Sequence, residues 1–278
     1  MANPKTSRFL SFVGLAVVAA AGFAACGGSR NYDTGNEGGS GGASSGSESG
    51  STSGGMTSSG SMGSGGSTGS GASACANAAT FKGDGTYYDA TGDGSCSFGP
   101  SADKPLLIGA MNTPDYANSN VCGTCAHITG PNGEVTVRIV DQCPGCVHGD
   151  IDLSPEAFEK LAPLLDGRIT INWQFVPCDV TGPIVYHFKE GSNQWWTAVQ
   201  IRNHRHGIAK FEWQSSDGVW HDVPRVDYNY FIDDKGMGPG PYTFRVTDVE
   251  GGVVEDTGIP FLEAGDVPGK SQFPPCAP

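Results

Sequence analysis

Residues 137–158 read VRIVDQCPGCVHGDIDLSPEAF, and this stretch predicts a strand that is followed by a helix. Residues 135–140 alternate apolar and polar side chains and are rich in β-branched types, as in a half-buried strand. Ser154 is a favourable helix N-cap, and Pro155 suits the first helical position. A helix is therefore expected from residue 155, with an apolar stripe of Ala157, Phe158, Leu161 and Leu165, and Pro163 is expected to end it.

Further strand patterns divide the chain into two domains. Residues 168–175 alternate with period two and stop at Pro177-Cys178, where turn residues follow. Four shorter strand patterns then come at the spacing of an antiparallel sandwich, over residues 184–190, 197–203, 209–214 and 242–247. We therefore expect a mainly β protein with domains at 75–178 and 179–278.

The first 74 residues are set apart by composition. Lys5 and Arg8 precede an apolar run over residues 9–25, which indicates an export signal. Small residues directly before Cys26 resemble a bacterial lipoprotein signal, which implies lipidation of Cys26; an ordinary secretory signal is the alternative. Residues 27–74 contain 17 Gly and 15 Ser, so residues 26–74 are expected to form a disordered linker behind the lipid-anchored cysteine.

Charge excludes some partners. The chain carries a net charge of −13, and both domains are acidic, with 5 basic against 12 acidic residues over 75–178 and 8 against 14 over 179–278. Nucleic acid is therefore not expected as a partner, and long-range repulsion disfavours tight binding to polyanions.

Nine cysteines call for a metal or for disulfides. Cys122-x-x-Cys125 and Cys143-x-x-Cys146 fit the spacing of a four-cysteine zinc ribbon. An export signal favours disulfides instead, and setting Cys26 aside leaves an even number, eight. We therefore assign no metal and no cofactor, with zinc as the alternative.

A resemblance connects these features. Residues 137–143 and 149–158 look like the double-psi β-barrel of expansins and the related barwin proteins. Residues 189–192, 195–204 and 227–229 resemble the cellulose-binding second domain of bacterial expansins. The resemblance implies a six-stranded double-psi β-barrel followed by an immunoglobulin-like β-sandwich.

The same resemblance implies the site residues. Asp152 matches the acid of the expansin groove and Asp141 a second groove carboxylate, while Thr86 and Tyr87 match a segment that lines it. In the second domain, Trp195, Trp196 and Tyr228 match an aromatic platform on which a glucan chain stacks, with Lys189 beside it. The family also suggests disulfides Cys96–Cys122 and Cys125–Cys178, which leaves Cys143–Cys146 and Cys75–Cys276.

Expansins loosen cell walls without detectable hydrolysis, so we expect a protein that binds cellulose or related neutral glucans and loosens their contacts. We expect a monomer that is exported and either anchored at the cell surface or secreted. The alternative is a weak endoglucanase or peptidoglycan lytic transglycosylase with Asp152 as general acid, for which Asp141, Asp89 and Asp150 are the candidate bases. A third possibility is a carbohydrate-binding adhesin in which the barrel is only a spacer.

Overall fold

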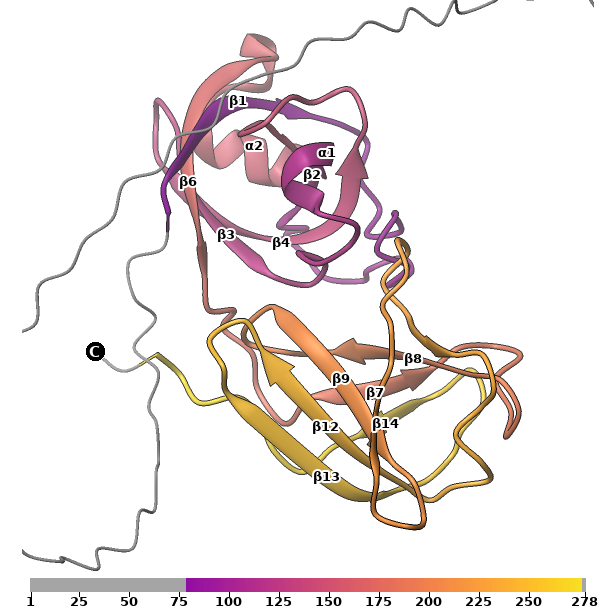
Figure 1. Ribbon diagram of the computed structural model, residues 1–278. Helices are drawn as coiled ribbons and strands as arrows, with labels where there is room; N and C mark the ends of the chain where they lie inside the picture. Colours follow the sequence, from indigo (N-terminus) through magenta and orange to yellow (C-terminus); the bar gives the residue numbers. More distant parts are fainter. Residues whose placement is uncertain (1–78, 277–278) are drawn as a thin grey trace, which may run out of the picture. The chain divides into compact units, whose positions relative to one another are not determined.

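The computed structural model describes residues 79–276 (Figure 1). The barrel and the sandwich belong to one compact unit of the chain. The expected signal at residues 1–25, the lipidated Cys26, the linker and Cys75 lie outside the described residues. Within residues 79–276, no helix has the length and apolar character needed to cross a membrane.

Six strands close into a barrel in the order β1-β5-β2-β4-β3-β6. The pairs β1·β5 and β2·β4 are parallel, and the other pairs are antiparallel. The barrel is filled by apolar side chains, among them Met111, Ile139, Ile151, Leu153 and Trp173. The strands are β1 (Phe81–Tyr87), β2 (Ile108–Asn112), β3 (Cys125–Thr129), β4 (Glu134–Cys143), β5 (Ile151–Leu153) and β6 (Ile169–Val176).

The barrel also carries the short helices α1 (Thr113–Tyr116) and α2 (Pro155–Leu161) and the 3-10 turn η1 (Leu164–Asp166). Ser154 caps α2 as expected, because its hydroxyl accepts a hydrogen bond from the backbone N–H of Ala157 at 3.4 Å. The apolar stripe is wrong at Leu165, which is 98% exposed. Since α2 ends before Pro163, Leu165 falls in η1 and points away from the core.

The second part of the chain is a β-sandwich of two four-stranded sheets. One sheet has the order β10-β9-β12-β13 and the other β11-β8-β7-β14. Aromatic side chains dominate the core between them, including Tyr186, Phe188, Phe211 and Phe244. The strands are β7 (Val185–Phe188), β8 (Thr197–Arg202), β9 (Ile208–Gln214), β10 (Trp220–Asp222), β11 (Phe231–Asp233), β12 (Tyr242–Asp248), β13 (Val253–Ile259) and β14 (Asp266–Pro268).

The cysteines form disulfides Cys96–Cys122, Cys125–Cys178 and Cys143–Cys146. The four cysteines with zinc-ribbon spacing are thus divided among three separate bonds, so the zinc alternative is wrong for them. Cys276 is also disulfide-bonded. Its expected partner Cys75 lies outside the described residues.

Candidate functional site

Two carboxylates of the barrel are brought together by strand β2. Ala110 of β2 pairs with Asp152 of β5 on one side and with Asp141 of β4 on the other. Residues directly opposite one another on neighbouring strands project from the same face of a sheet. Since strands are about 4.7–4.9 Å apart, the Cα atoms of the two aspartates are about 9–10 Å apart. Asp152 and Asp141 therefore share one outer face of the barrel.

Asp152 is held by Thr86. The two residues pair in register between β5 and β1, and the Thr86 hydroxyl donates a hydrogen bond to Asp152 Oδ1 at 2.5 Å. Partial burial raises the pKa of Asp152 above its ordinary value, while the Thr86 hydrogen bond and the charge of Arg168 oppose this rise. The balance favours a carboxyl group that keeps its proton to higher pH than a solvated aspartate.

Asp141 is bound to the backbone of a nearby loop. Its Oδ1 accepts hydrogen bonds from the N–H groups of Ser95, at 2.7 Å, and of Gln142, at 2.8 Å. Gly94 lies so close that a Cβ atom there would be 2.5 Å from Asp141 Cγ. The loop can reach the carboxylate only because residue 94 has no side chain.

Two further residues belong to this face and were not predicted. Arg168 immediately precedes β6, and its Nη1 atom lies 2.9 Å from Asp84 Oδ2. The hydroxyl of Tyr88 is buried and has no hydrogen bond of good geometry among the described residues. Burial raises the pKa of Tyr88, and the charges of Asp141 and Asp152 raise it further. The period-two pattern of residues 168–175 was the available signal for Arg168; no sequence pattern distinguishes Tyr88 from its neighbours.

Tyr87 occupies a different position from Thr86. Its ring lies 5.0 Å from that of Phe158 in α2 and is 39% exposed. Adjacent strand residues point to opposite faces. Tyr87 therefore lies toward the helix, whereas Thr86 faces Asp152.

The surroundings of Asp150, Asp89 and Asp141, the candidate bases, do not favour a general-base role. The carboxylate of Asp150 is buried and accepts the backbone N–H groups of Asp84, at 2.8 Å, and Val147, at 3.2 Å, so it organises a turn. Asp89 is exposed, with no hydrogen bond among the described residues. Asp141 lies beside Asp152 on the same face, whereas an inverting hydrolase needs its base across the sugar from its acid.

The two adjacent tryptophans of the sandwich lie in a turn before β8. Trp195 is 71% exposed and Trp196 is half-buried. In a regular strand they would point to opposite faces, but β8 begins only at Thr197. Asn193 closes the turn, because its N–H donates to Trp196 O at 2.8 Å and its Oδ1 accepts from Trp195 N–H at 2.9 Å. The turn therefore leaves Trp195 open to solvent.

Tyr228 and Lys189 meet at a third aromatic residue, Tyr230. The ring centroids of Tyr228 and Tyr230 are 5.9 Å apart, and Lys189 Nζ lies 5.9 Å from the Tyr230 centroid. Tyr228 is 36% exposed, whereas Tyr230 is buried. Lys189 follows β7 and the two tyrosines precede β11, and both strands belong to the sheet whose strand β8 follows Trp195 and Trp196. Tyr230 is thus a support beneath the predicted binding residues.

Hydrogen bonds join the sandwich to the barrel next to both the carboxylates of the barrel and the aromatic residues of the sandwich. The side chains of Gln200 and Asn229 donate to the carbonyl oxygen of Cys96, at 2.9 and 3.2 Å. Cys96 follows Ser95, whose N–H holds Asp141, and Asn229 follows Tyr228. The carboxylates and the aromatic residues are therefore connected through one short segment of each domain.

Comparison with known proteins places the chain in a family. A family model described as lytic transglycolase matches residues 74–173. Expansin-YoaJ of Bacillus subtilis (strain 168) is 39% identical over 179 residues, which cover 61% of this chain and 76% of that protein. The chain belongs to the expansin family. The expansin of Clavibacter michiganensis, solved as the apo protein, matches with a TM-score of 0.66 and 34% identity, over 72% of this chain and 100% of that one.

A mutant of the same Clavibacter expansin was solved in complex with cellohexaose and matches with a TM-score of 0.67 and 31% identity, over the same shares of both chains. Both expansin structures are covered in full, so the match includes the barrel and the sandwich. The expected architecture of an expansin, a closed six-stranded barrel followed by further β-sheets, is confirmed.

Proposed function

We propose that this expansin is an exported protein that binds cellulose or a related neutral β-glucan and loosens contacts between wall polysaccharides without hydrolysing them. The carrying observation is that Trp195 and Tyr228 are exposed on segments that precede β8 and β11, two neighbouring strands of the sheet that is hydrogen-bonded to the loop holding Asp141. The C–H faces of pyranose rings are apolar and cover aromatic rings without removing a charge from water. The related expansin that was solved with cellohexaose supports this choice of ligand.

The barrel face supports a non-hydrolytic role. Asp152 can donate a hydrogen bond to a glucan oxygen when protonated, which its raised pKa favours, and can accept one from a glucan hydroxyl when ionised. Asp141 lies beside it with Oδ1 already bound by two backbone N–H groups. Cleavage by inversion needs a second carboxylate across the sugar, with room for water between the two. We propose that the pair displaces glucan–glucan hydrogen bonds, with Thr86 positioning Asp152.

Three expectations from the sequence remain proposals: the lipid anchor at Cys26, display at the cell surface and a monomeric state. Export accords with the disulfides, since these bonds persist in oxidising compartments. The acidic charge favours neutral glucans over polyanionic wall polymers.

Adsorption to amorphous cellulose tests the platform. Replacing Trp195 and Trp196 by alanine is expected to weaken adsorption at least tenfold. The matched control is Trp220→Ala, which removes a partly exposed tryptophan from the other sheet, where its ring stacks on Arg245 at 3.8 Å. Equal loss in both variants would contradict the proposed binding surface.

The release of soluble sugars and reducing ends tests the chemistry. Wild-type protein and Asp152→Ala are incubated with amorphous cellulose and with peptidoglycan. We expect no release from either polymer, together with weakening of cellulose paper by the wild type and not by the variant. Release that disappears in the variant would identify a hydrolase or a transglycosylase instead. If Asp152→Ala still weakens paper, the result would favour an adhesin in which the barrel is only a spacer.

A further inference from the structure

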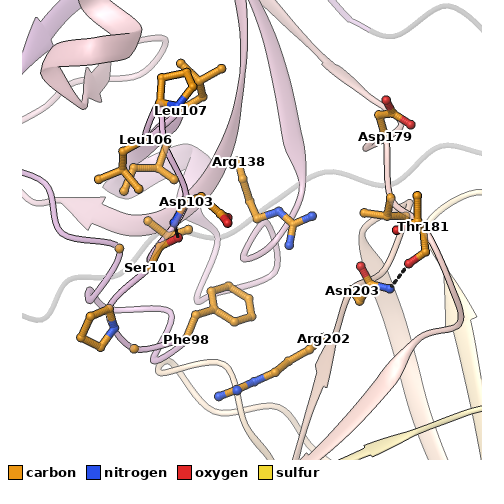
Figure 2. Close-up of a pocket in the computed structure, with 17 residues that line it drawn as sticks. Phe98, Ser101, Asp103, Leu106, Leu107, Arg138, Asp179, Thr181, Arg202 and Asn203 are labelled. Atoms are coloured by element: carbon orange, nitrogen blue, oxygen red, sulfur yellow. Dashed lines mark hydrogen bonds between the residues drawn. The ribbon is translucent and has the colours of Figure 1, made fainter.

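A cavity of about 670 Å³ is lined by none of the predicted site residues (Figure 2). Its lining comes mainly from the loop after Cys96, from β4 and from the start and end of the sandwich segment 179–203. None of Asp152, Asp141, Trp195 or Tyr228 lines it. Volumes of about 300–1,000 Å³ are typical of sites for small ligands. The cavity therefore has the size of a site for one or two sugar rings.

Arg138 is the distinctive residue of this cavity. Its side chain extends from β4 into the space between Asp103 on one side and Asn203 on the other (Figure 2). No hydrogen bond or ion pair engages the guanidinium among the described residues. Burial lowers the pKa of Arg138, and the charge of Asp103 opposes this change. A largely buried guanidinium without a partner is costly, and a bound anion would relieve that cost.

His204, which is close enough to Arg138 for their charges to interact, offers it no negative charge. His204 is buried, and burial together with the charge of Arg138 lowers its pKa to about 3, so its ring is neutral near pH 7. Arg202, the second arginine of the lining, already donates from Nε to Gln200 Oε1 at 2.6 Å and lies 3.3 Å from Asp266. Arg138 is therefore the guanidinium that remains available to a ligand.

The rest of the lining suits a sugar. The half-buried ring of Phe98 borders the space and offers an apolar surface to a pyranose face (Figure 2). Ser101, Thr181 and Asn203 add hydroxyl and amide groups that can exchange hydrogen bonds with sugar hydroxyls. Asp103 and Asp179 are exposed at the rim, where solvent and salt screen their charges.

We propose that this cavity is a second carbohydrate site, which takes a uronic acid residue through an ion pair between its carboxylate and Arg138. The strongly acidic surface repels a polyanion, so the matching ligand is a neutral glycan that carries isolated uronic acid substituents. The site is separate from the platform proposed for neutral glucan and can exist whether or not that platform binds cellulose.

The test follows the Arg138 Nε–H signal of the wild-type protein by ¹H–¹⁵N NMR during titration with D-glucuronate, D-glucose and acetate. We expect glucuronate to shift this signal in a saturable way, more strongly than acetate, and glucose to leave it in place. No shift up to 50 mM glucuronate would overturn the proposal. An equal response to acetate would overturn the assignment of a sugar site.

Variants separate this site from the platform. Arg138→Met keeps much of the apolar side chain and removes the charge, and it is expected to weaken glucuronate binding at least tenfold, because charge-assisted hydrogen bonds are the strong ones. Trp195→Ala is expected to bind glucuronate as the wild type does. Loss of glucuronate binding in Trp195→Ala would show that the sugar binds on the platform and would overturn the proposal. Should Arg138→Met fail to fold, the titration of the wild-type signal decides alone.

Discussion

Gln200 of β8 donates a hydrogen bond from Nε2 to the carbonyl oxygen of Cys96, at a distance of 2.9 Å, and its side chain is fully buried. Cys96 belongs to the loop that holds Asp141, and Gln200 belongs to the sheet that carries the aromatic residues. Together with the hydrogen bond that Asn229 donates to the same oxygen, this contact joins the two groups of residues on which wall loosening is proposed to depend. The loop is thus positioned from both domains at once.

Gln200→Leu is expected to lower the free energy of unfolding by about 1–3 kcal/mol, because it removes one donor to a buried carbonyl and the acceptor of Arg202. Thermal and denaturant unfolding measure the change. Gln214→Leu is the matched control: its amide donates to Gly218 O at an exposed turn, and we expect a change within about 0.5 kcal/mol. Equal effects would mean that the Gln200 contact adds nothing to stability.

Asp152→Asn is expected to raise the melting temperature at pH 7 and not at pH 3. The folded state raises the pKa of Asp152, so ionisation is disfavoured in the fold. Below the unfolded pKa both states are protonated and no penalty exists; above the folded pKa the full penalty applies. Asparagine resembles the protonated form and can still accept from Thr86.

Asp217→Asn is expected to change the melting temperature in the opposite direction from Asp152→Asn. The Ser215 hydroxyl lowers the pKa of Asp217, so its ionised form is favoured in the fold and its replacement lowers the melting temperature at neutral pH. This effect is expected to be small because the residue is exposed. A gain for Asp152→Asn that is the same at pH 3 and pH 7 would contradict the role of ionisation.

Gly94→Ala is expected to abolish paper weakening and to destabilise the protein by about 1–3 kcal/mol, since the new methyl group meets the Asp141 carboxylate. Gly145→Ala is the matched control, because nothing lies within 4 Å of a Cβ at that position. Calorimetry and paper weakening are measured for both. Normal activity in Gly94→Ala would show that the placement of Asp141 by this loop is dispensable.

Replacing Cys96 and Cys122 together by serine is expected to cost about 3–4 kcal/mol, because the bond closes a loop of 26 residues. The loop that carries Ser95 is then expected to exchange its amide hydrogens faster. Replacing Cys143 and Cys146, which are separated by 3 residues, is expected to cost only about 1–2 kcal/mol. Amide hydrogen exchange and denaturant unfolding distinguish the two, and the reverse order of costs would contradict the loop-closure argument.

Local sequence patterns predicted several elements correctly. The alternation at residues 135–140 and 168–175 corresponds to β4 and β6, and the Ser154–Pro155 start corresponds to α2. These elements follow from interactions within a few residues, which a sequence displays directly. Strand β1 escaped prediction because it contains Gly83 and Gly85, which weaken a strand pattern. Gly85 is needed there, since a Cβ would lie 2.9 Å from the side chain of Ile171.

The amino-acid sequence by itself determined the two-domain order, the kinds of residue at the site and, through family resemblance, the partners of the described disulfides. Only the tertiary structure decided that Ala110 brings Asp141 and Asp152 onto one face, that Tyr88 lies beside them and that Arg138 enters a separate cavity. The reason is physical: cross-strand neighbours are set by the register of strands far apart in the chain. A shift of one residue would turn each of these side chains to the opposite face.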